Sequence, residues 1–279
     1  RRHLPVLRAA IDLLSAGLVE RDAEARLVLL GTLAQEHVLL LGPPGTGKSA
    51  LGRRLANLCG GPFFQRLLTK FTTPEEIFGP LSLRALENDE YRRRTEGYLP
   101  TASVAFLDEI FKANSAILNA LLTLLNERRF DNGAGDREEC PLRCLVGASN
   151  ELPESEELDA LYDRFLLRAE VRPVSDAGLL KLLALSTPGS PCDDADTCNA
   201  ALAADLDPIV SELARAADAT PLPPDLAHLL RRLRAFVRED LDADLTDRRL
   251  VRAARLLRII AAAHGRGVDP LDALLLRHV

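Results

Sequence analysis

A short apolar run that ends in a glycine-rich turn constrains the fold of this chain most. The run extends from His37 to Leu41, and the turn reads Gly42, Pro43, Pro44, Gly45, Thr46, Gly47, Lys48, Ser49. An apolar run of this length, closed by turn residues, is typical of a buried parallel strand. Helical spacing begins after Lys48, through Leu51, Leu55 and Leu58. The order strand, turn, helix therefore fits the phosphate-binding pattern G-x-x-x-x-G-K-S/T in its required context.

Each residue type in this turn suits the binding of phosphate. Glycines let backbone N–H groups face phosphate oxygens, and the positive end of the following helix points at the same anion. Lys48 offers a charge to the β- and γ-phosphates, and Ser49 offers a hydroxyl ligand to Mg²⁺. We predict that residues 42–49, with Ala50 in the first helical turn, bind a nucleoside triphosphate. A turn that binds nothing is disfavoured, because all eight positions match in register.

Hydrolysis requires polar groups beyond the phosphate loop. Asp108 and Glu109 follow the apolar residues 104–107, so we expect two carboxylates at the carboxyl end of a buried strand, where ligands of open α/β sheets bind. Asp108 is the predicted Mg²⁺ ligand, and Glu109 the predicted base that activates water. Asn150 follows a third apolar run, 144–148, and its amide suits both the water and the γ-phosphate. The alternative is a pair of solvated acids and an ordinary turn asparagine.

The apolar runs divide the chain into two parts. Strand-like runs at 38–41, 104–107 and 144–148 alternate with helical sequence, which predicts a parallel sheet covered on both faces. After Pro173 the strand signals stop, and helical segments follow near 175–185, 199–217, 224–239 and 247–263. Residues 186–196 read as a loop. We predict an α/β core over 1–172 and a small all-α domain over 173–279.

Composition narrows the classes of function. The formal net charge of −6 argues against a protein whose main task is sequence-independent binding of nucleic acid. No apolar run reaches the roughly 18–20 residues that a membrane span requires. The five cysteines (Cys59, Cys140, Cys144, Cys192, Cys198) include no C-x₂-C pair. This usage favours reduced, unliganded thiols in a cytoplasmic protein.

The order of the motifs resembles that of AAA+ ATPases, and the details are similar to the MoxR branch. The segments that carry the resemblance are 36–49, Glu75-Glu76-Ile77-Phe78-Gly79-Pro80-Leu81, 96–100, Phe106-Leu107-Asp108-Glu109-Ile110, 119–122, 126–128 and Asp163-Arg164-Phe165. Within that branch the chain is most similar to the subgroup typified by RavA. The resemblance covers nearly the whole chain, and it implies that the all-α domain is a lid on the nucleotide-binding core.

The resemblance assigns further residues. Asn150 takes the place of the sensor-1 polar residue, and Arg164 that of the arginine finger that reaches a neighbouring subunit's nucleotide. Arg248 matches the sensor-2 arginine of the lid, and Arg249, one position on, is the alternative. For Arg164 the plain alternative is a surface salt bridge. Residues 81–96 resemble the insert in helix 2, and residues 128–143 resemble the hairpin before sensor 1.

The function implied is Mg²⁺-dependent ATP hydrolysis by a ring, of six subunits by resemblance. Such a ring remodels a protein client or helps to insert a metal or cofactor, together with a von Willebrand A-domain partner. Two alternatives remain open at this point. One is a binding platform whose assembly is controlled by ATP and whose ATP turnover is incidental; the presence of Glu109 argues against it. The other is an ATPase that acts on DNA; the acidic balance argues against it, whereas Arg92, Arg93 and Arg94 favour it.

Overall fold

The computed structural model describes residues 2–133, 137–185, 200–243 and 245–279. The strands are β1 (Val38–Leu41), β2 (Phe63–Leu67), β3 (Val104–Asp108), β4 (Arg129–Asp131), β5 (Arg137–Glu139), β6 (Cys144–Ser149) and β7 (Leu167–Glu170). The helices of the first part are α1 (Leu4–Ser15), α2 (Asp22–Ala34), α3 (Lys48–Cys59), α4 (Pro74–Phe78), α5 (Leu83–Leu86), η1 (Leu99–Thr101), η2 (Ile110–Lys112), α6 (Ser115–Glu127) and α7 (Glu156–Tyr162). The remaining helices are α8 (Asp176–Leu185), α9 (Ala200–Ala219), α10 (Pro224–Asp240), α11 (Asp247–Ala263) and η3 (Pro270–His278).

The central sheet confirms the predicted α/β fold. It has five strands in the order β2-β3-β6-β1-β7, and every pairing is parallel. β1, β3 and β6, which the apolar runs predicted, are the three inner strands. Sequence patterns missed β2 and β7, because these edge strands carry exposed polar residues such as Gln65 and Glu170 and lack a continuous apolar run.

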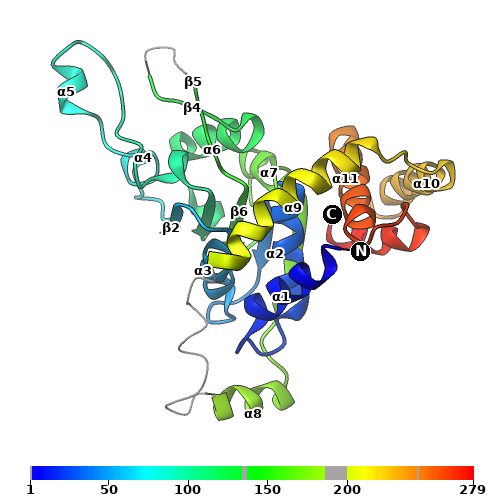
Figure 1. Ribbon diagram of the computed structural model, residues 1–279. Helices are drawn as coiled ribbons and strands as arrows, with labels where there is room; N and C mark the ends of the chain where they lie inside the picture. Colours follow the sequence, from blue (N-terminus) through cyan, green and yellow to red (C-terminus); the bar gives the residue numbers. More distant parts are fainter. Residues whose placement is uncertain (1, 134–136, 186–199, 244) are drawn as a thin grey trace.

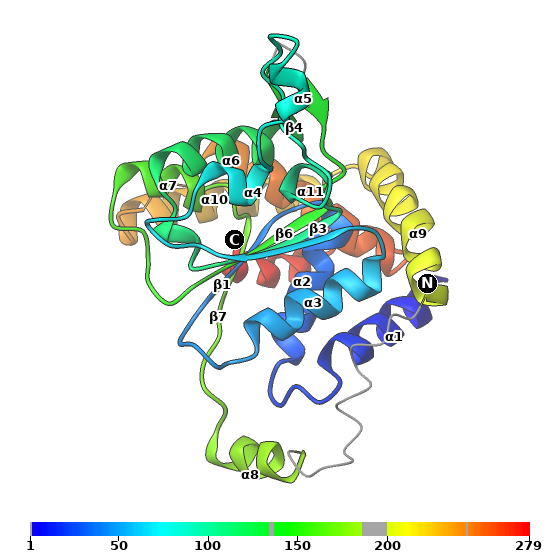
Figure 2. The same cartoon turned by 90° about the vertical axis from the view of Figure 1, so that its left-hand side faces the viewer.

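Helices cover both faces of this sheet, as predicted. On one face α1, α2, α3, α9 and α11 contribute to an apolar cluster that includes Val38, Phe106 and Val146 from the strands. On the other face α4, α6 and α7 enclose a second cluster around Leu39, Leu107 and Leu145. Figure 2 shows the sheet between α6 and α7 on one side and α2 and α3 on the other. This packing fixes the carboxyl ends of the inner strands, where the phosphate loop lies.

Two segments project from the core next to each other (Figure 1). The insert at 81–96 carries the short helix α5 on a two-stranded stem, in which Leu81 pairs with Arg93. The hairpin of β4 and β5 is antiparallel, as its sequence predicted. Asn132 joins the two: its side chain is buried, accepts a hydrogen bond from Arg93 N at 2.8 Å and donates one to Arg93 O at 3.3 Å.

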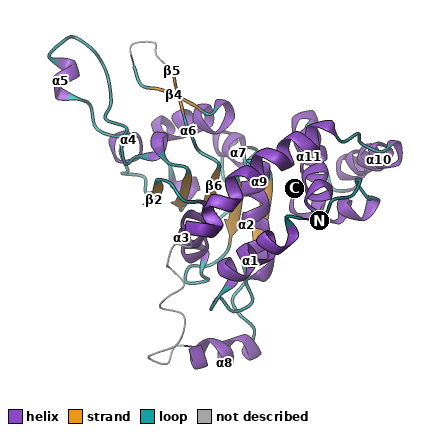
Figure 3. Cartoon of the chain, viewed as in Figure 1, coloured by secondary structure: helices purple, strands orange, loops and turns teal. Residues whose placement is uncertain are grey.

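The described residues after β7 form helices only (Figure 3), in agreement with the predicted all-α part. α9 lies against α2 and α3, and its Leu206, Ile209 and Leu213 belong to the apolar cluster of the core. The division near residue 172 stays a prediction. The loop expected at 186–196 falls outside the described residues. None of the described helices has the length and apolar character that crossing a bilayer requires.

Candidate functional site

The phosphate loop lies between β1 and α3 at the carboxyl edge of the sheet. Its first residue, Gly42, donates from N to Ser149 O at 2.9 Å, and a Cβ at this position would meet Val171 O at 2.1 Å. Gly47 has φ of +85° and begins α3 without a side-chain cap. The first N–H groups of α3 therefore lack an intrahelical partner and stay available to an anion.

Lys48 lies inside this loop. Its side chain is buried, and Nζ donates to Gly42 O at 2.7 Å and to Pro43 O at 2.8 Å. Burial lowers the pKa of the Lys48 ammonium, whereas the nearby carboxylates of Asp108 and Glu109 act in the opposite direction. The structure thus brings together the lysine and the acidic pair that the sequence predicted separately.

The acidic pair ends β3. Asp108 Oδ1 accepts a hydrogen bond from Glu109 N at 3.0 Å, and Glu109 has left-handed backbone geometry with φ of +52°. Glu109 Oε2 is inaccessible to solvent and makes no hydrogen bond, although Lys112 Nζ lies 3.2 Å away. Left-handed geometry at a residue other than glycine is uncommon and costs free energy, which marks this position as a functional candidate.

Asn150 lies at the same edge. It follows Ser149, the last residue of β6, which pairs with Leu41 at the end of β1. Asn150 is exposed and therefore accessible to a ligand at the phosphate loop. Ser49 is the second residue of α3, in the turn after Lys48. A buried ammonium, two carboxylates, a hydroxyl and an amide at one edge are the donors and acceptors that a triphosphate with Mg²⁺ requires. The residues present fit that group.

Arg164 and Arg248 lie at the other end of the strands, where β1 and β7 begin. Arg164 precedes β7, whose first residue, Leu167, pairs with Val38 at the start of β1. Because β1 and β7 are parallel, Arg164 is near the amino end of β1 and the phosphate loop is at its carboxyl end. Arg248 donates to Asn126 Oδ1 at the end of α6.

A cluster of charged side chains surrounds these two arginines. Burial is the main cause that lowers the pKa of Arg248, and the positive charges of Arg164 and Arg252 lower it further. Arg252 pairs with Glu36, two residues before β1 begins. Arg249 differs from Arg248: it is 8% exposed, and its Nη1 lies 3.6 Å from Asp163 Oδ1. Arg248, in contrast, is exposed.

Arg21 is a functional candidate that sequence patterns missed. Its buried guanidinium donates to Thr46 O at 2.8 Å, to Glu20 O at 2.7 Å and to Arg172 O at 2.6 Å. It joins the phosphate loop to the segment after β7. Two of its three partners, Thr46 and Arg172, are far away in sequence, so the one local signal is its place between two helices.

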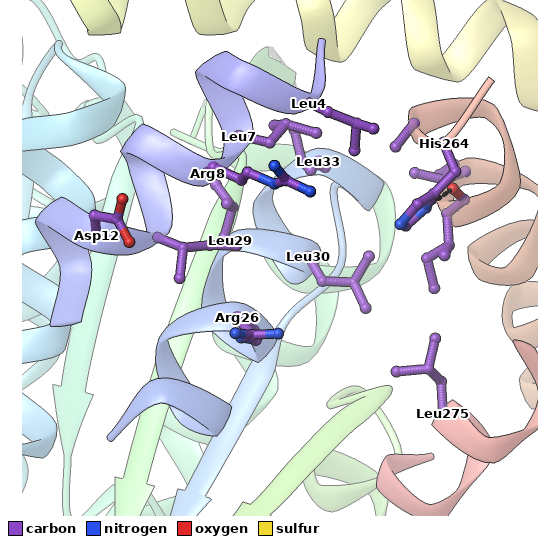
Figure 4. Close-up of a pocket in the computed structure, with 14 residues that line it drawn as sticks. Leu4, Leu7, Arg8, Asp12, Arg26, Leu29, Leu30, Leu33, His264 and Leu275 are labelled. Atoms are coloured by element: carbon purple, nitrogen blue, oxygen red, sulfur yellow. Dashed lines mark hydrogen bonds between the residues drawn. The ribbon is translucent and has the colours of Figure 1, made fainter. Parts of the chain in front are cut away.

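A cavity of about 300 Å³ lies next to the phosphate loop. Its lining residues come from three segments: Gly17, Leu18, Val19 and Arg21; Pro43, Pro44, Gly45, Thr46 and Gly47; Pro173, Val174 and Leu182. Apart from Arg21, the lining residues outside the loop are glycine or apolar, which suits the flat face of a nucleobase better than a second phosphate group. A larger groove lies elsewhere, between α1, α2 and α11 (Figure 4).

The described thiols take no part in this site. Cys59, Cys140 and Cys144 are buried and unpaired, and burial raises the pKa of Cys59 and of Cys144 to about 12. Cys192 and Cys198 fall outside the described residues. Within the described residues, no group of three or more His, Cys, Asp or Glu side chains has the arrangement of a metal site.

Comparison with known proteins identifies the family. The family described as the MoxR domain in MoxR-vWA-beta-propeller ternary systems matches residues 5–205, and an AAA lid domain matches residues 225–279. The chain belongs to the MoxR family of AAA+ ATPases. The lid match agrees with the helical C-terminal part.

Individual relatives agree with this assignment. The uncharacterized protein MJ0812 of Methanocaldococcus jannaschii is 42% identical over 270 residues, which cover 95% of this chain and 69% of the relative. The chaperone MoxR1 of Mycobacterium tuberculosis is 30% identical over 158 residues, 55% of this chain and 41% of MoxR1. A crystal structure of a candidate ATPase from Cytophaga hutchinsonii superposes with a TM-score of 0.74 at 15% identity, over 97% of this chain and 84% of that chain, and supports the AAA+ fold alone.

Proposed function

We propose that this MoxR-type chain hydrolyses ATP with Mg²⁺ at sites that two subunits share. Residues 42–50 bind the triphosphate, with Lys48 on the β- and γ-phosphates. Ser49 and Asp108 hold Mg²⁺, which when bound neutralises negative charge on the phosphates. Glu109 takes the proton from the attacking water, and Asn150 orients that water toward the γ-phosphate.

The observation that supports this proposal is that the predicted site residues fall into two groups, one at the carboxyl ends of the strands and one at the amino ends. Lys48, Asp108, Glu109 and Asn150 lie at the carboxyl edge, whereas Arg164 and Arg248 lie at the amino edge of the same sheet. The strand between them is four residues long, which is about 13 Å at ~3.3 Å per residue. Neither arginine reaches the phosphate loop of its own chain, so both act on a neighbour's nucleotide.

This division implies a head-to-tail contact. The amino edge of one subunit faces the phosphate loop of the next, and such heterologous contacts close into a ring when the rotation permits. We propose a ring of six, on family resemblance. An arginine that enters in trans stabilises negative charge on the transferred phosphoryl group, so hydrolysis depends on assembly. The proposed lid, 173–279, supplies Arg248 to the same contact.

The partners follow from the family. Because the matching family is described in MoxR-vWA-beta-propeller systems, we propose that the ring acts with a von Willebrand A-domain protein and a β-propeller protein. The ring remodels a protein client in a chaperone-like way, or assists metal or cofactor insertion. The RavA-like subgroup and the cytoplasmic location stay predictions.

The test is the steady-state ATPase rate per subunit, measured over a range of protein concentrations. The shared site predicts that this rate rises with concentration for the wild type and stays near background for Arg164→Ala at every concentration. Arg238→Ala, an exposed arginine on α10, is the matched control and behaves as the wild type. A rate per subunit that does not depend on concentration, with Arg164→Ala fully active, contradicts the proposal.

A further inference from the structure

Helix α8 presents an apolar face that the described residues of its own chain leave uncovered. Leu179, Leu180 and Leu183 are 45%, 71% and 61% exposed. No other described helix or strand packs extensively against α8, which projects from the fold in Figure 1 and Figure 2. A helix of ten residues is marginal in water on its own and normally gains its stability from packing.

The uncovered face has a definite pattern. Asp176, Leu179, Leu180 and Leu183 are spaced i, i+3, i+4 and i+7, so they share one side of the helix. The side is therefore apolar along its length, with one carboxylate in the first turn. Successive residues of a helix are about 100° apart around its axis, so Lys181 lies on the opposite side of α8. This arrangement is that of a helix that binds in a groove.

The same chain carries a groove with the complementary properties. It has a volume of about 650 Å³ and lies between α1, α2, α11 and η3 (Figure 4). Leu7, Leu29, Leu33, Ile259 and Ala263 form a buried apolar floor, and Leu30 and Leu275 are partly exposed at its sides. None of the residues that line it comes from α8.

Charged groups around the groove are mostly basic. Arg8, Arg26 and His264 line it together with one carboxylate, that of Asp12. Figure 4 shows Arg8 on α1 and Arg26 on α2 beside the apolar floor. Both arginines are exposed, and within the described part of the chain neither guanidinium has an ion-pair partner. A helix with leucines and a carboxylate on one face matches this surface in charge and in polarity.

We propose that α8 of one subunit docks into the groove between α1, α2 and α11 of the next subunit. Leu179, Leu180 and Leu183 fill the apolar floor, and Asp176 pairs with Arg8 or Arg26. The contact joins two different surfaces, so it is heterologous, as the shared nucleotide site requires. α8 follows Val174, which lines the cavity next to the phosphate loop, so docking holds that cavity near the neighbouring subunit. The inference rests on the proposed ring.

The experiment measures assembly by sedimentation velocity of the full chain with Mg²⁺ and a non-hydrolysable ATP analogue. Leu180→Glu, and separately the double variant Arg8→Glu with Arg26→Glu, raise the concentration at half-assembly about tenfold or more, as expected for loss of an anchor at the centre of an interface. Lys181→Glu, on the opposite side of α8, assembles as the wild type. All substituted side chains are exposed, so the fold is retained, which circular dichroism checks.

Mixing the two impaired proteins gives the decisive result. Leu180→Glu retains an intact groove, and the double arginine variant retains an intact α8. An equimolar mixture therefore forms dimers through the one remaining intact contact and nothing larger. Adding Asp176→Arg to the double variant restores its assembly, because the charges are then exchanged.

Assembly of Leu180→Glu at wild-type concentrations, or a mixture without dimers, overturns the docking proposal. If the ATPase rate per subunit of the wild type still rises with concentration in that case, the proposal of a shared nucleotide site is retained. A wild type that stays monomeric at all concentrations overturns the docking proposal together with the ring. If the protein assembles through α8 but Arg164→Ala retains the wild-type ATPase rate, the shared site alone is overturned.

Discussion

Lys48 and Arg164 lie at opposite ends of the strands of one parallel sheet, Lys48 at the carboxyl ends and Arg164 at the amino ends. Lys48 begins α3 after the carboxyl end of β1, and Arg164 lies three residues before Leu167, which pairs with the amino-terminal residue of β1. Both residue types bind phosphate, yet the strand between them prevents them from binding the same phosphate within one chain. The proposed activity is therefore one that needs two subunits rather than one.

The Glu109→Gln substitution separates binding from hydrolysis. A glutamine at this position retains the shape of the side chain but cannot accept the proton of the attacking water. We expect kcat to fall by roughly 10²–10⁴, the usual contribution of a general base. The Kd for a fluorescent ATP analogue stays within about threefold of the wild type, because the phosphate loop is unchanged. Turnover at more than a tenth of the wild-type rate contradicts the assigned role.

The Lys48→Met substitution removes nucleotide binding without loss of the fold. Burial lowers the pKa of this ammonium, which shows that the charge is held at a cost in the folded chain. The variant without nucleotide still unfolds cooperatively, at a melting temperature somewhat below that of the wild type, because Gly42 O and Pro43 O lose their donor. ATP with Mg²⁺ raises the melting temperature of the wild type, because a ligand that binds only the folded state stabilises it. ATP leaves Lys48→Met unchanged; an equal rise in both proteins contradicts the assignment.

Arg21→Ala weakens both the fold and the site. The substitution leaves three backbone carbonyls without their charged donor, and it detaches the phosphate loop from residue 172. We expect the free energy of unfolding to fall by about 2–3 kcal/mol, and affinity for ATP to fall with it. Arg53→Gln, an exposed arginine on α3, is the control. Urea unfolding curves and nucleotide titrations that match the wild type disprove this role of Arg21.

His37 makes stability depend on pH below neutrality. The imidazole is buried: Nδ1 accepts from Leu145 N at 3.1 Å, and Nε2 faces Leu125 O at 3.4 Å, so the ring is neutral. Burial, with smaller effects of Arg128 and Arg252, places the pKa of His37 well below its usual value. In the unfolded chain the pKa is about 6.5, so below that pH the unfolded state binds a proton that the folded state refuses.

Protonation of His37 in the unfolded chain makes the folded state less stable as the pH falls. His37 costs nothing at pH 7.5, and the stability falls as the pH drops through about 6.5. Between pH 7.5 and 5.5 this residue removes at most about 1.4 kcal/mol from the free energy of unfolding, the amount for a ring that stays neutral in the folded chain. Urea unfolding at both pH values measures the loss, and His37→Gln, which retains a donor and an acceptor, shows a loss smaller by that amount. Equal losses in the two proteins contradict the account.

Sequence patterns predicted the carboxyl edge of the sheet well and the rest of the site less well. The phosphate loop, Asp108 and Asn150 each follow an apolar run, and in parallel strands such ends meet at one edge. Nothing local shows that Arg21 bonds to Thr46, because that contact spans 25 residues. The separation of Arg164 and Arg248 from the phosphate loop depends on the place of β7 next to β1, and sequence patterns missed β7. The roles of the site residues stay predictions.

The most direct test of the shared site mixes two inactive variants. Glu109→Gln keeps Arg164, and Arg164→Ala keeps Glu109, so each protein alone lacks one half of every site. In a mixed ring an Arg164→Ala subunit receives the arginine of a Glu109→Gln neighbour, and about one contact in four is complete if subunits mix at random. We predict that an equimolar mixture recovers up to about a quarter of the wild-type ATPase rate. A mixture as inactive as its two components, under conditions where the subunits exchange, contradicts the claim that Arg164 acts on a neighbour's nucleotide.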